Sequence, residues 1–351
     1  QAQGNKNILI NGAMQVAQRG TSSTGVGASN GVFPCVDRMK VFAGNTAGRS
    51  TVSQVADVHD GFANALKFEC TTADTSIAAD EFFGMQYIIE GQDLQQLKKG
   101  TSDAESFTFS FYVKGNASAT YTAEIRDLDN DRINTQTFAV TTSWNRISLT
   151  FIPDTTGAFD DDNAGSLQLS FWLHAGSTYT GGTFASNTWA SRVQGNRVNS
   201  SQTSFFDSTS RTFFITGVQL EVGDVATPFE HESYAATLQK CQRYYTTSGF
   251  NGGTPYGGGG IAMTCINVNE AGGTVIFPTT MRAGPTIRTK DAAGNIGGIH
   301  RAAVANVTSG VSVQWAGNAE SDKVGFSGLT KSNAWAAGNV LIGVWDATAE
   351  L

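Results

Sequence analysis

The sequence predicts an all-β protein that has an N-terminal jelly-roll sandwich, a short helix and a second, smaller β-sandwich domain. Segments of alternating apolar and polar residues recur through the first part of the chain, and turn-forming Gly, Asn, Asp or Pro residues end each of them. Glycine supplies 40 of the 351 residues, and only 15% are charged, against about 25% in an average soluble domain. This composition disfavours helical bundles, and a hydrophobic fraction of 40% is ample for a packed core.

The clearest strand is Ser106–Lys114. Phe107, Phe109 and Phe111 fall on one face of it, while Ser, Thr and Tyr residues fall on the other. This alternation predicts a half-buried antiparallel strand. The same pattern predicts strands at residues 121–128, 146–151, 167–173 and 212–218. Several short strands with turn signals between them are typical of a sandwich or jelly roll.

One segment has helical periodicity instead. Tyr234, Leu238 and Cys241 recur at the i, i+4, i+7 spacing of an apolar helix stripe. A glycine-rich run at residues 249–260 follows the segment. We therefore expect a jelly-roll domain over 1–232, a connecting helix over 233–246 and a β domain over 247–351. Strands of that last domain are expected at 261–268, 274–277, 311–315, 324–329 and 340–345.

Charge and cysteine content exclude several classes of protein. A net charge of −7 and a pI near 5.1 argue against nucleic acid or an anionic membrane as the main partner. No stretch approaches the roughly 20 apolar residues that a membrane span needs. The four cysteines lie far apart without a CxxC pair, which indicates buried free thiols in a reducing cytosol. A Cys241–Cys265 bridge remains an alternative.

Candidate catalytic and metal-binding groups are few, and no cofactor is expected. The histidines are His59, His174, His231 and His300. They are scattered, so each is interpreted as a surface or hydrogen-bonded residue rather than a ligand. Asp160 and Asp162 belong to the densest acidic cluster and are weak candidates for binding Ca²⁺. Because neighbours along an extended chain point to opposite sides, a solvated turn is the preferred interpretation.

Aromatic residues in polar loops are more promising binding groups. Tyr179 and Trp189 lie in the long polar segment 177–204, and Tyr256 lies in the glycine-rich run. Flat aromatic rings can stack on the C–H faces of sugars while polar neighbours complete the hydrogen bonds. The competing interpretation is that these rings plug one end of the sandwich or a subunit interface.

Four segments of the sequence resemble one protein family. They are NILINGAMQVAQRG at residues 7–20, CVDR at 35–38, ITGVQLEVGDVATPFE at 215–230 and CQRYY at 241–245. Over roughly residues 1–245 the chain resembles virion proteins of tailed bacteriophages that are described as tail fibres or as carbohydrate-binding-module-like structural proteins. The resemblance implies a jelly roll similar to carbohydrate-binding modules, a second small β domain and a homotrimer.

The resemblance also implies a function. It predicts a non-enzymatic protein of the virion surface, made in the host cytoplasm. The expected role is a short trimeric tail fibre or spike that attaches to host-surface glycans, with other virion proteins as further partners. The candidate interface residues are Tyr234, Leu238, Tyr244 and Tyr245. A head decoration, head-fibre or connector protein with an architectural role is the alternative, and a polysaccharide depolymerase is disfavoured because no catalytic motif is visible.

Overall fold

The computed structural model describes residues 6–249, 260–291, 295–301, 305–307, 309–314, 323–332 and 335–351. The chain divides into two compact units. The first comprises Gln1–Ala17, Thr21–Tyr234 and Leu351, and the second comprises Gln18–Gly20 and Ala235–Glu350. The helix expected as a connector therefore groups with the second unit, together with three residues from near the N-terminus.

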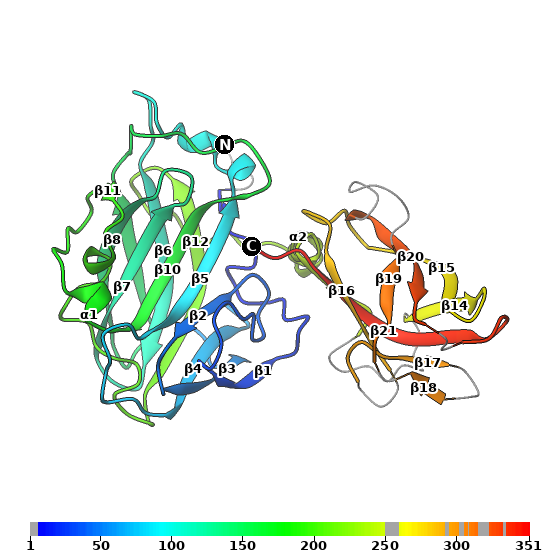
Figure 1. Ribbon diagram of the computed structural model, residues 1–351. Helices are drawn as coiled ribbons and strands as arrows, with labels where there is room; N and C mark the ends of the chain where they lie inside the picture. Colours follow the sequence, from blue (N-terminus) through cyan, green and yellow to red (C-terminus); the bar gives the residue numbers. More distant parts are fainter. Residues whose placement is uncertain are drawn as a thin grey trace. The chain divides into compact units, whose positions relative to one another are not determined.

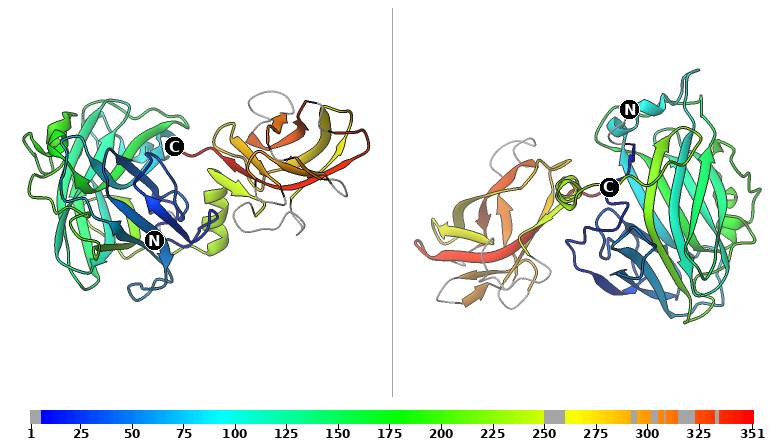
Figure 2. Two further views of the ribbon diagram at one scale, coloured as in Figure 1. Left: turned by 60° about the horizontal axis from the view of Figure 1, so that its bottom comes forward. Right: turned by 180° about the vertical axis from the view of Figure 1, so that it is seen from behind.

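The first unit is a β-sandwich of two six-stranded antiparallel sheets (Figure 1). In order across the first sheet, the strands are β1 (Ser22–Val26), β3 (Arg49–Val55), β4 (Ala65–Thr72), β12 (Thr212–Val222), β6 (Phe107–Gly115) and β9 (Asn145–Phe151). Across the second sheet they are β11 (Ala190–Ser191), β8 (Arg132–Val140), β7 (Ala119–Asp127), β10 (Gly165–Ala175), β5 (Phe82–Glu90) and β2 (Lys40–Gly44). The right-hand view of Figure 2 shows the first sheet from behind, with β12 in yellow-green. The predicted sandwich is thus confirmed.

Aromatic side chains from both sheets form the core of this unit. Phe109 and Phe111 of β6 contact Phe171 of β10, with ring centroids 5.3 and 4.9 Å apart. Burying each such ring stabilises the fold by about 1.5–3 kcal/mol. The alternation that predicted β6 therefore marks the face that packs on the opposite sheet.

The other face of β6 differs from expectation, because it is also covered. Thr108 and Ser110 are fully buried rather than exposed. The Thr108 hydroxyl donates to the carbonyl of Gly223, and Arg146 of β9 donates to Ser110 and to the carbonyl of Thr227. The chain after β12 thus folds back over the outside of the sheet and covers the outer face of β6 at Thr108 and Ser110.

The second unit is also built of strands. In its described part, β21 (Val340–Thr348) is central and pairs with β13 (Tyr245–Thr247), β14 (Ile261–Cys265), β16 (Thr286–Lys290) and β17 (Ile299–Arg301). The remaining strands are β15 (Glu270–Ile276), β18 (Ala305–Val307), β19 (Ser312–Gln314) and β20 (Gly325–Thr330). Phe277, Phe326 and Trp345 meet in the core, with centroids 5.3–6.3 Å apart. The expected second β domain is therefore present.

The helix α2 (Tyr234–Gln242) differs in detail from the expected stripe. Its buried residues are Thr237 and Cys241, whereas Leu238 is half-buried and the Tyr234 side chain is 56% exposed. Tyr234 is the first helical residue, so its side chain projects from the end of the helix rather than from its packed face.

Tyr244 and Tyr245 lie in the interior of the second unit. Both rings are buried, and the Tyr245 hydroxyl donates to Asp346 at 3.0 Å. The guanidinium of Arg19 lies 3.6 Å from the centre of the Tyr245 ring. These two rings are therefore not available to a partner subunit in this structure, and Tyr234 is the most exposed of the four proposed interface residues.

All four cysteines are free and buried, as the sequence predicts. Cys241 and Cys265 do not pair. Burial raises the pKa of the Cys35 thiol, and likewise that of Cys70, to about 11. Among the described helices, none has the length and apolar character required to cross a membrane.

Candidate functional site

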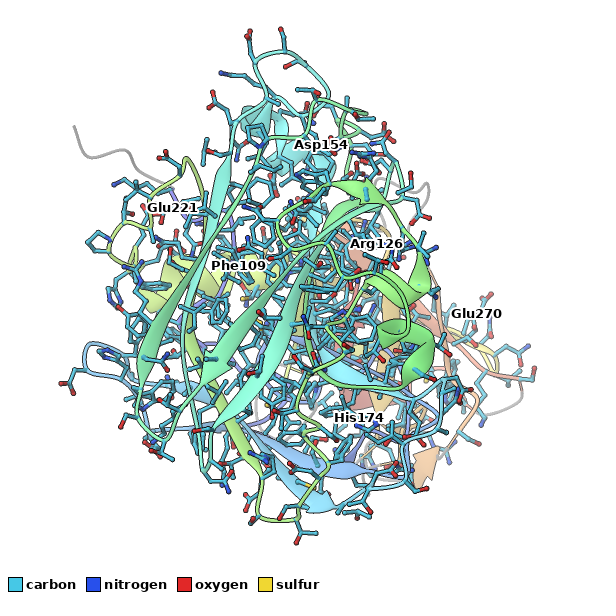
Figure 3. All side chains as sticks on the ribbon, turned by 90° about the vertical axis from the view of Figure 1, so that its left-hand side faces the viewer. Phe109, Arg126, Asp154, His174, Glu221 and Glu270 are labelled. Atoms are coloured by element: carbon cyan, nitrogen blue, oxygen red, sulfur yellow. The ribbon has the colours of Figure 1, made fainter. Side chains whose placement is uncertain are left out.

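A cavity of about 280 Å³ lies on the outer face of the second sheet. Strands β2, β5, β7 and β10 form its floor, and the segment between β10 and β12 forms one wall. The lining residues are Asn30, Gly31, Lys40, Phe42, Phe82, Gln86, Arg126, Gln168, Trp172, Tyr179, Gln194 and Arg197. Figure 3 labels one of them, Arg126, among the side chains of the unit.

At one end of the floor, a glycine lies between two large aromatic rings and allows them to meet. Phe42 of β2 and Trp172 of β10 each lie opposite Gly84 of β5 in the strand register. The two rings meet edge to face across the glycine, with centroids 5.0 Å apart. A Cβ atom at Gly84 would lie 2.7 Å from the Phe42 ring and 2.1 Å from the carbonyl oxygen of Phe171. Glycine is therefore required for this aromatic contact.

Tyr179 extends the aromatic surface. It lies in the short helix α1 (Ser177–Thr180), which directly follows β10. Its ring centroid is 5.2 Å from that of Trp172 and 5.5 Å from that of Phe82, and both Tyr179 and Phe82 are half-buried. Burial raises the pKa of Tyr179, although the nearby Arg197 charge opposes this shift. The hydroxyl is thus a neutral donor, and it has no hydrogen-bond partner among the described residues.

A buried carboxylate fixes the polar wall of the cavity. Glu124 is fully buried on β7, where it accepts a hydrogen bond from the Trp172 indole at 2.5 Å and one from Arg197 Nε at 3.0 Å. The Arg197 guanidinium lies 4.7 Å from the centre of the Trp172 ring. Gln194, at the start of η3 (Gln194–Asn196), accepts from Arg197 at 3.0 Å. Paired in this way, the charge of Glu124 is compensated, and both lining side chains are held in place.

Amide groups complete the lining. The Gln168 side-chain amide donates to the Ser170 hydroxyl of the same strand at 2.9 Å. The side-chain oxygen of Asn30, Oδ1, accepts from the backbone N–H of Ala43 at 3.3 Å. The side chain of Gln86 has no hydrogen-bond partner among the described residues. An aromatic surface beside amides, a guanidinium and a free hydroxyl is a combination that can hold a sugar ring.

The lining of this cavity supplies aromatic, amide, hydroxyl and guanidinium groups. Among the described residues that line it there is no carboxylate, whereas glycoside hydrolysis by the usual route needs a pair of them. Glu124 lies beneath the floor, and both Trp172 and Arg197 hold it there.

Trp189, the second aromatic candidate, does not line this cavity. Its indole donates to the carbonyl of Ile152 at 2.8 Å, and its ring packs edge to face on Phe107. Trp189 therefore packs against the core of the sandwich, as the competing interpretation of these aromatic rings expects. Tyr256, the third candidate, lies outside the described residues.

The acidic candidates Asp160 and Asp162 are exposed and serve local turns. Asp162 accepts from the backbone of Ala164 at 2.8 Å, and the backbone of Asp160 donates to Asp129. Each bond satisfies a loop N–H group, as Asp side chains commonly do in turns. Among the described residues, their carboxylates do not belong to a group of side chains that could hold a metal ion.

A second cavity of about 400 Å³ lies beside a buried lysine network. Lys99 Nζ is 2.6 Å from Asp127, 3.2 Å from Asp154 and 2.7 Å from the carbonyl oxygens of both Thr156 and Gly157. Figure 3 shows Asp154 near one end of the unit. The Lys99 ammonium is already bound to these carboxylates and carbonyl oxygens, so this network does not need a ligand. We therefore place the functional site at the aromatic cavity.

Most residues of the aromatic cavity were not predicted from the sequence; Tyr179 was. The missed signal is the outer face of 167–173, where Gln168, Ser170 and Trp172 alternate with core residues. An aromatic residue in register with polar ones indicates a functional face. Gly84 carries no such local signal, because its role depends on the pairing of β5 with β2 and β10. Arg197 carries none either, because it follows η3 in a loop and reaches the cavity through its contact with Glu124.

No family model matches the chain, and no curated protein matches it. Several solved structures are similar to its fold. A CBM4 structure is 14% identical, covers 60% of this chain and 97% of its own, and has a TM-score of 0.31. The family 11 carbohydrate-binding module of Clostridium thermocellum, in complex with a β-1,3-1,4-mixed-linked tetrasaccharide, is 12% identical with coverages of 59% and 98% and a TM-score of 0.29.

The enzymatically active domain of tailspike protein 4 of bacteriophage CBA120 is also similar. It is 14% identical, covers 62% of this chain and 21% of its own, and has a TM-score of 0.31. At these values the similarity does not bear on function, and the sandwich assignment rests on the strand pairing of the chain itself.

Proposed function

We propose that the first unit is a glycan-binding domain whose binding site is the cavity over Phe42, Gly84 and Trp172. One observation carries the proposal. A half-buried Tyr179 ring with an unpaired hydroxyl and a Gln86 amide without a partner border the same cavity, on a floor of packed aromatic rings. Sugar recognition needs this combination of flat apolar surface and fixed polar groups.

The size of the cavity limits the ligand. Its volume of about 280 Å³ is near the lower end of small-molecule pockets, which span about 300–1,000 Å³. It therefore suits one or two sugar units at the end or branch of a polysaccharide rather than a long chain. A site this small binds weakly, so several copies acting together would supply the affinity.

In the cell-attachment role that we propose, the chain is a non-enzymatic virion protein. It is made in the host cytoplasm and displayed on the particle as a short trimeric tail fibre or spike, in contact with other virion proteins and with host-surface glycans. The support is the sequence resemblance together with the aromatic cavity. Exposed apolar side chains on the second unit favour self-association there, since Ile266 is 63% and Ile276 is 76% exposed.

These apolar residues also favour the second candidate, an architectural head decoration, head-fibre or connector protein. In that role the second unit provides the contacts and the cavity has no ligand. Binding of fluorescently labelled protein to host cells, with an unrelated bacterium as control, separates the two roles. Saturable, host-restricted binding that free host polysaccharide competes away supports attachment. A folded oligomer that does not bind supports the architectural role.

The matched variants are Tyr179→Ala and Trp189→Phe. Loss of the Tyr179 ring removes about 1.5–2 kcal/mol of stacking and hydrogen bonding, which is roughly a 10- to 30-fold loss of affinity per site. Trp189→Phe changes a ring outside the cavity and should bind like the wild type. If Tyr179→Ala binds host polysaccharide with the affinity of the wild type, the cavity is not the glycan-binding site.

A further inference from the structure

Three buried side chains that commonly bind metals converge at one end of the first unit. Asp74 follows β4, Glu81 directly precedes β5, and His174 lies near the end of β10. One ligand atom from each lies within 4.8 Å of the others. Their residues are 7%, 5% and 0% exposed. Figure 3 shows His174 at the end of the unit opposite Asp154.

The hydrogen bonds around the cluster leave ligand atoms available. His174 Nε2 lies 3.2 Å from Glu81 Oε2, and His174 Nδ1 lies 2.8 Å from the Ser204 hydroxyl. Asp74 Oδ2 accepts from Thr46 Oγ1 at 2.8 Å and from the backbone of Ala47 at 2.7 Å. The backbone of Gly48 also interacts with the Asp74 carboxylate. Glu81 Oε1 has no hydrogen-bond partner among the described residues.

The two carboxylates of the cluster form no ion pair with a Lys or Arg residue in the part of the chain that the structure describes. Among the described ion pairs, Glu81 contacts only His174, and Asp74 has no Lys or Arg partner. A cation bound between the two carboxylates would therefore be their first charged partner other than His174 among the described residues.

We propose that Asp74, Glu81 and His174 Nε2 bind a divalent transition-metal ion, with Zn²⁺ as the favoured ion. An imidazole with two carboxylates suits Zn²⁺, whereas Ca²⁺ takes six to eight oxygen ligands. His174 Nδ1–H would donate to the Ser204 hydroxyl, the outer-shell hydrogen bond that orients metal-binding histidines. The ion replaces the Glu81–His174 hydrogen bond and leaves a fourth position for water.

The ion would stabilise the walls of the aromatic cavity. Glu81 immediately precedes Phe82 in the chain, and its carbonyl accepts from the backbone of Gly176 at 2.8 Å, just before the helix that carries Tyr179. An ion bound by both Glu81 and His174 would therefore fix the two segments that carry the Phe82 and Tyr179 rings. The metal site does not depend on the proposed glycan function, since its ligands are not among the lining residues.

The test is zinc binding by the full chain after removal of metal with a chelator. Isothermal titration with ZnCl₂ should show one site, and the melting temperature should rise on the order of 5–10 °C at zinc about 100-fold above Kd. The isosteric variants Asp74→Asn and Glu81→Gln should each weaken zinc binding by more than the roughly 10- to 100-fold that loss of an outer-shell partner costs. Ser204→Ala should weaken it within that range.

The matched controls are Asp162→Asn and His59→Asn, which remove an acid and a histidine outside the cluster and should bind zinc like the wild type. Melting of each metal-free variant establishes that it is folded. If an Asp74 or Glu81 variant does not fold, the Ser204→Ala variant and wild-type stoichiometry decide the matter. The proposal is wrong if the folded wild type binds no zinc, or if it binds zinc with an affinity that Ser204→Ala and the folded cluster variants leave unchanged.

Discussion

Replacing Lys99 by Met should destabilise the first unit strongly. The Lys99 side chain is 5% exposed, and its ammonium contacts the carboxylates of Asp127 and Asp154, whose side chains are 0% and 4% exposed. Met has a similar length and no charge, so the variant keeps the packing of the stem and removes the cation alone. Removing one partner of a buried ion pair costs about 3–5 kcal/mol, because the remaining charge is left without compensation.

The structure places the expected loss at the lower end of that range. Asp154 keeps two hydrogen bonds from Arg132, at 2.8 and 3.1 Å. Asp127 keeps the backbone N–H groups of Asp129 and Asn130, both at 3.0 Å. A loss of about 3 kcal/mol is large against a total stability of roughly 5–15 kcal/mol. For a domain of this size it lowers the melting temperature by about 6–12 °C.

Lys98→Met is the matched control, because Lys98 is adjacent in sequence but its side chain is 52% exposed and pairs with Glu105 at the surface. Calorimetry and urea unfolding followed by tryptophan fluorescence should show no resolvable shift for this variant. The Trp189 ring lies 5.7 Å from Lys99 Nζ and reports on this region. If Lys99→Met and Lys98→Met melt at the same temperature, the Lys99 network does not hold this end of the sandwich.

Three further predictions concern packing and charge. Trp189→Phe should lower the free energy of unfolding by about 0.5–1.5 kcal/mol through loss of the indole hydrogen bond, and urea titration that shows no loss would contradict its structural role. Gly84→Ala should cost about 3 kcal/mol, since the added Cβ meets a backbone carbonyl, and an unchanged melting temperature would show that the aromatic floor tolerates a side chain. Asp74 and Asp154 have pKa values below the usual range, so their contribution to stability is complete above the unfolded-state pKa of about 4 and is lost as pH falls through the lower folded values. Melting temperatures measured from pH 7 to pH 2 should therefore be steady at first and fall below about pH 4, and a profile that stays flat to pH 2 would count against this account.

Local patterning was sufficient for the strands with one clearly apolar face. The expected strand at 167–173 corresponds to β10, whose Leu167, Leu169 and Phe171 all belong to the core. Strand β5 was missed because apolar residues occupy both of its faces. Phe83 and Met85 contact the core while Phe82 lies on the outer face, so simple alternation is lost.

The site was harder to predict because it depends on pairing between distant segments. Tyr179 was found from its place in a polar loop, and the same reasoning proposed Trp189, which the core holds instead. The Trp189 indole has a hydrogen-bond partner, whereas the Tyr179 hydroxyl has none among the described residues. The sequence does not reveal this difference. The Asp74–Glu81–His174 cluster likewise joins residues a hundred positions apart in the chain.

The buried thiols make the native chain suitable for site-specific labelling. All four cysteines are buried, and the raised pKa of Cys35 and Cys70 leaves almost no thiolate, which is the form that reacts with maleimides and other electrophiles. A cysteine introduced at the exposed Ser177, two positions before Tyr179, would therefore be the reactive one. A fluorophore attached there can report on occupancy of the neighbouring cavity without prior removal of any native cysteine.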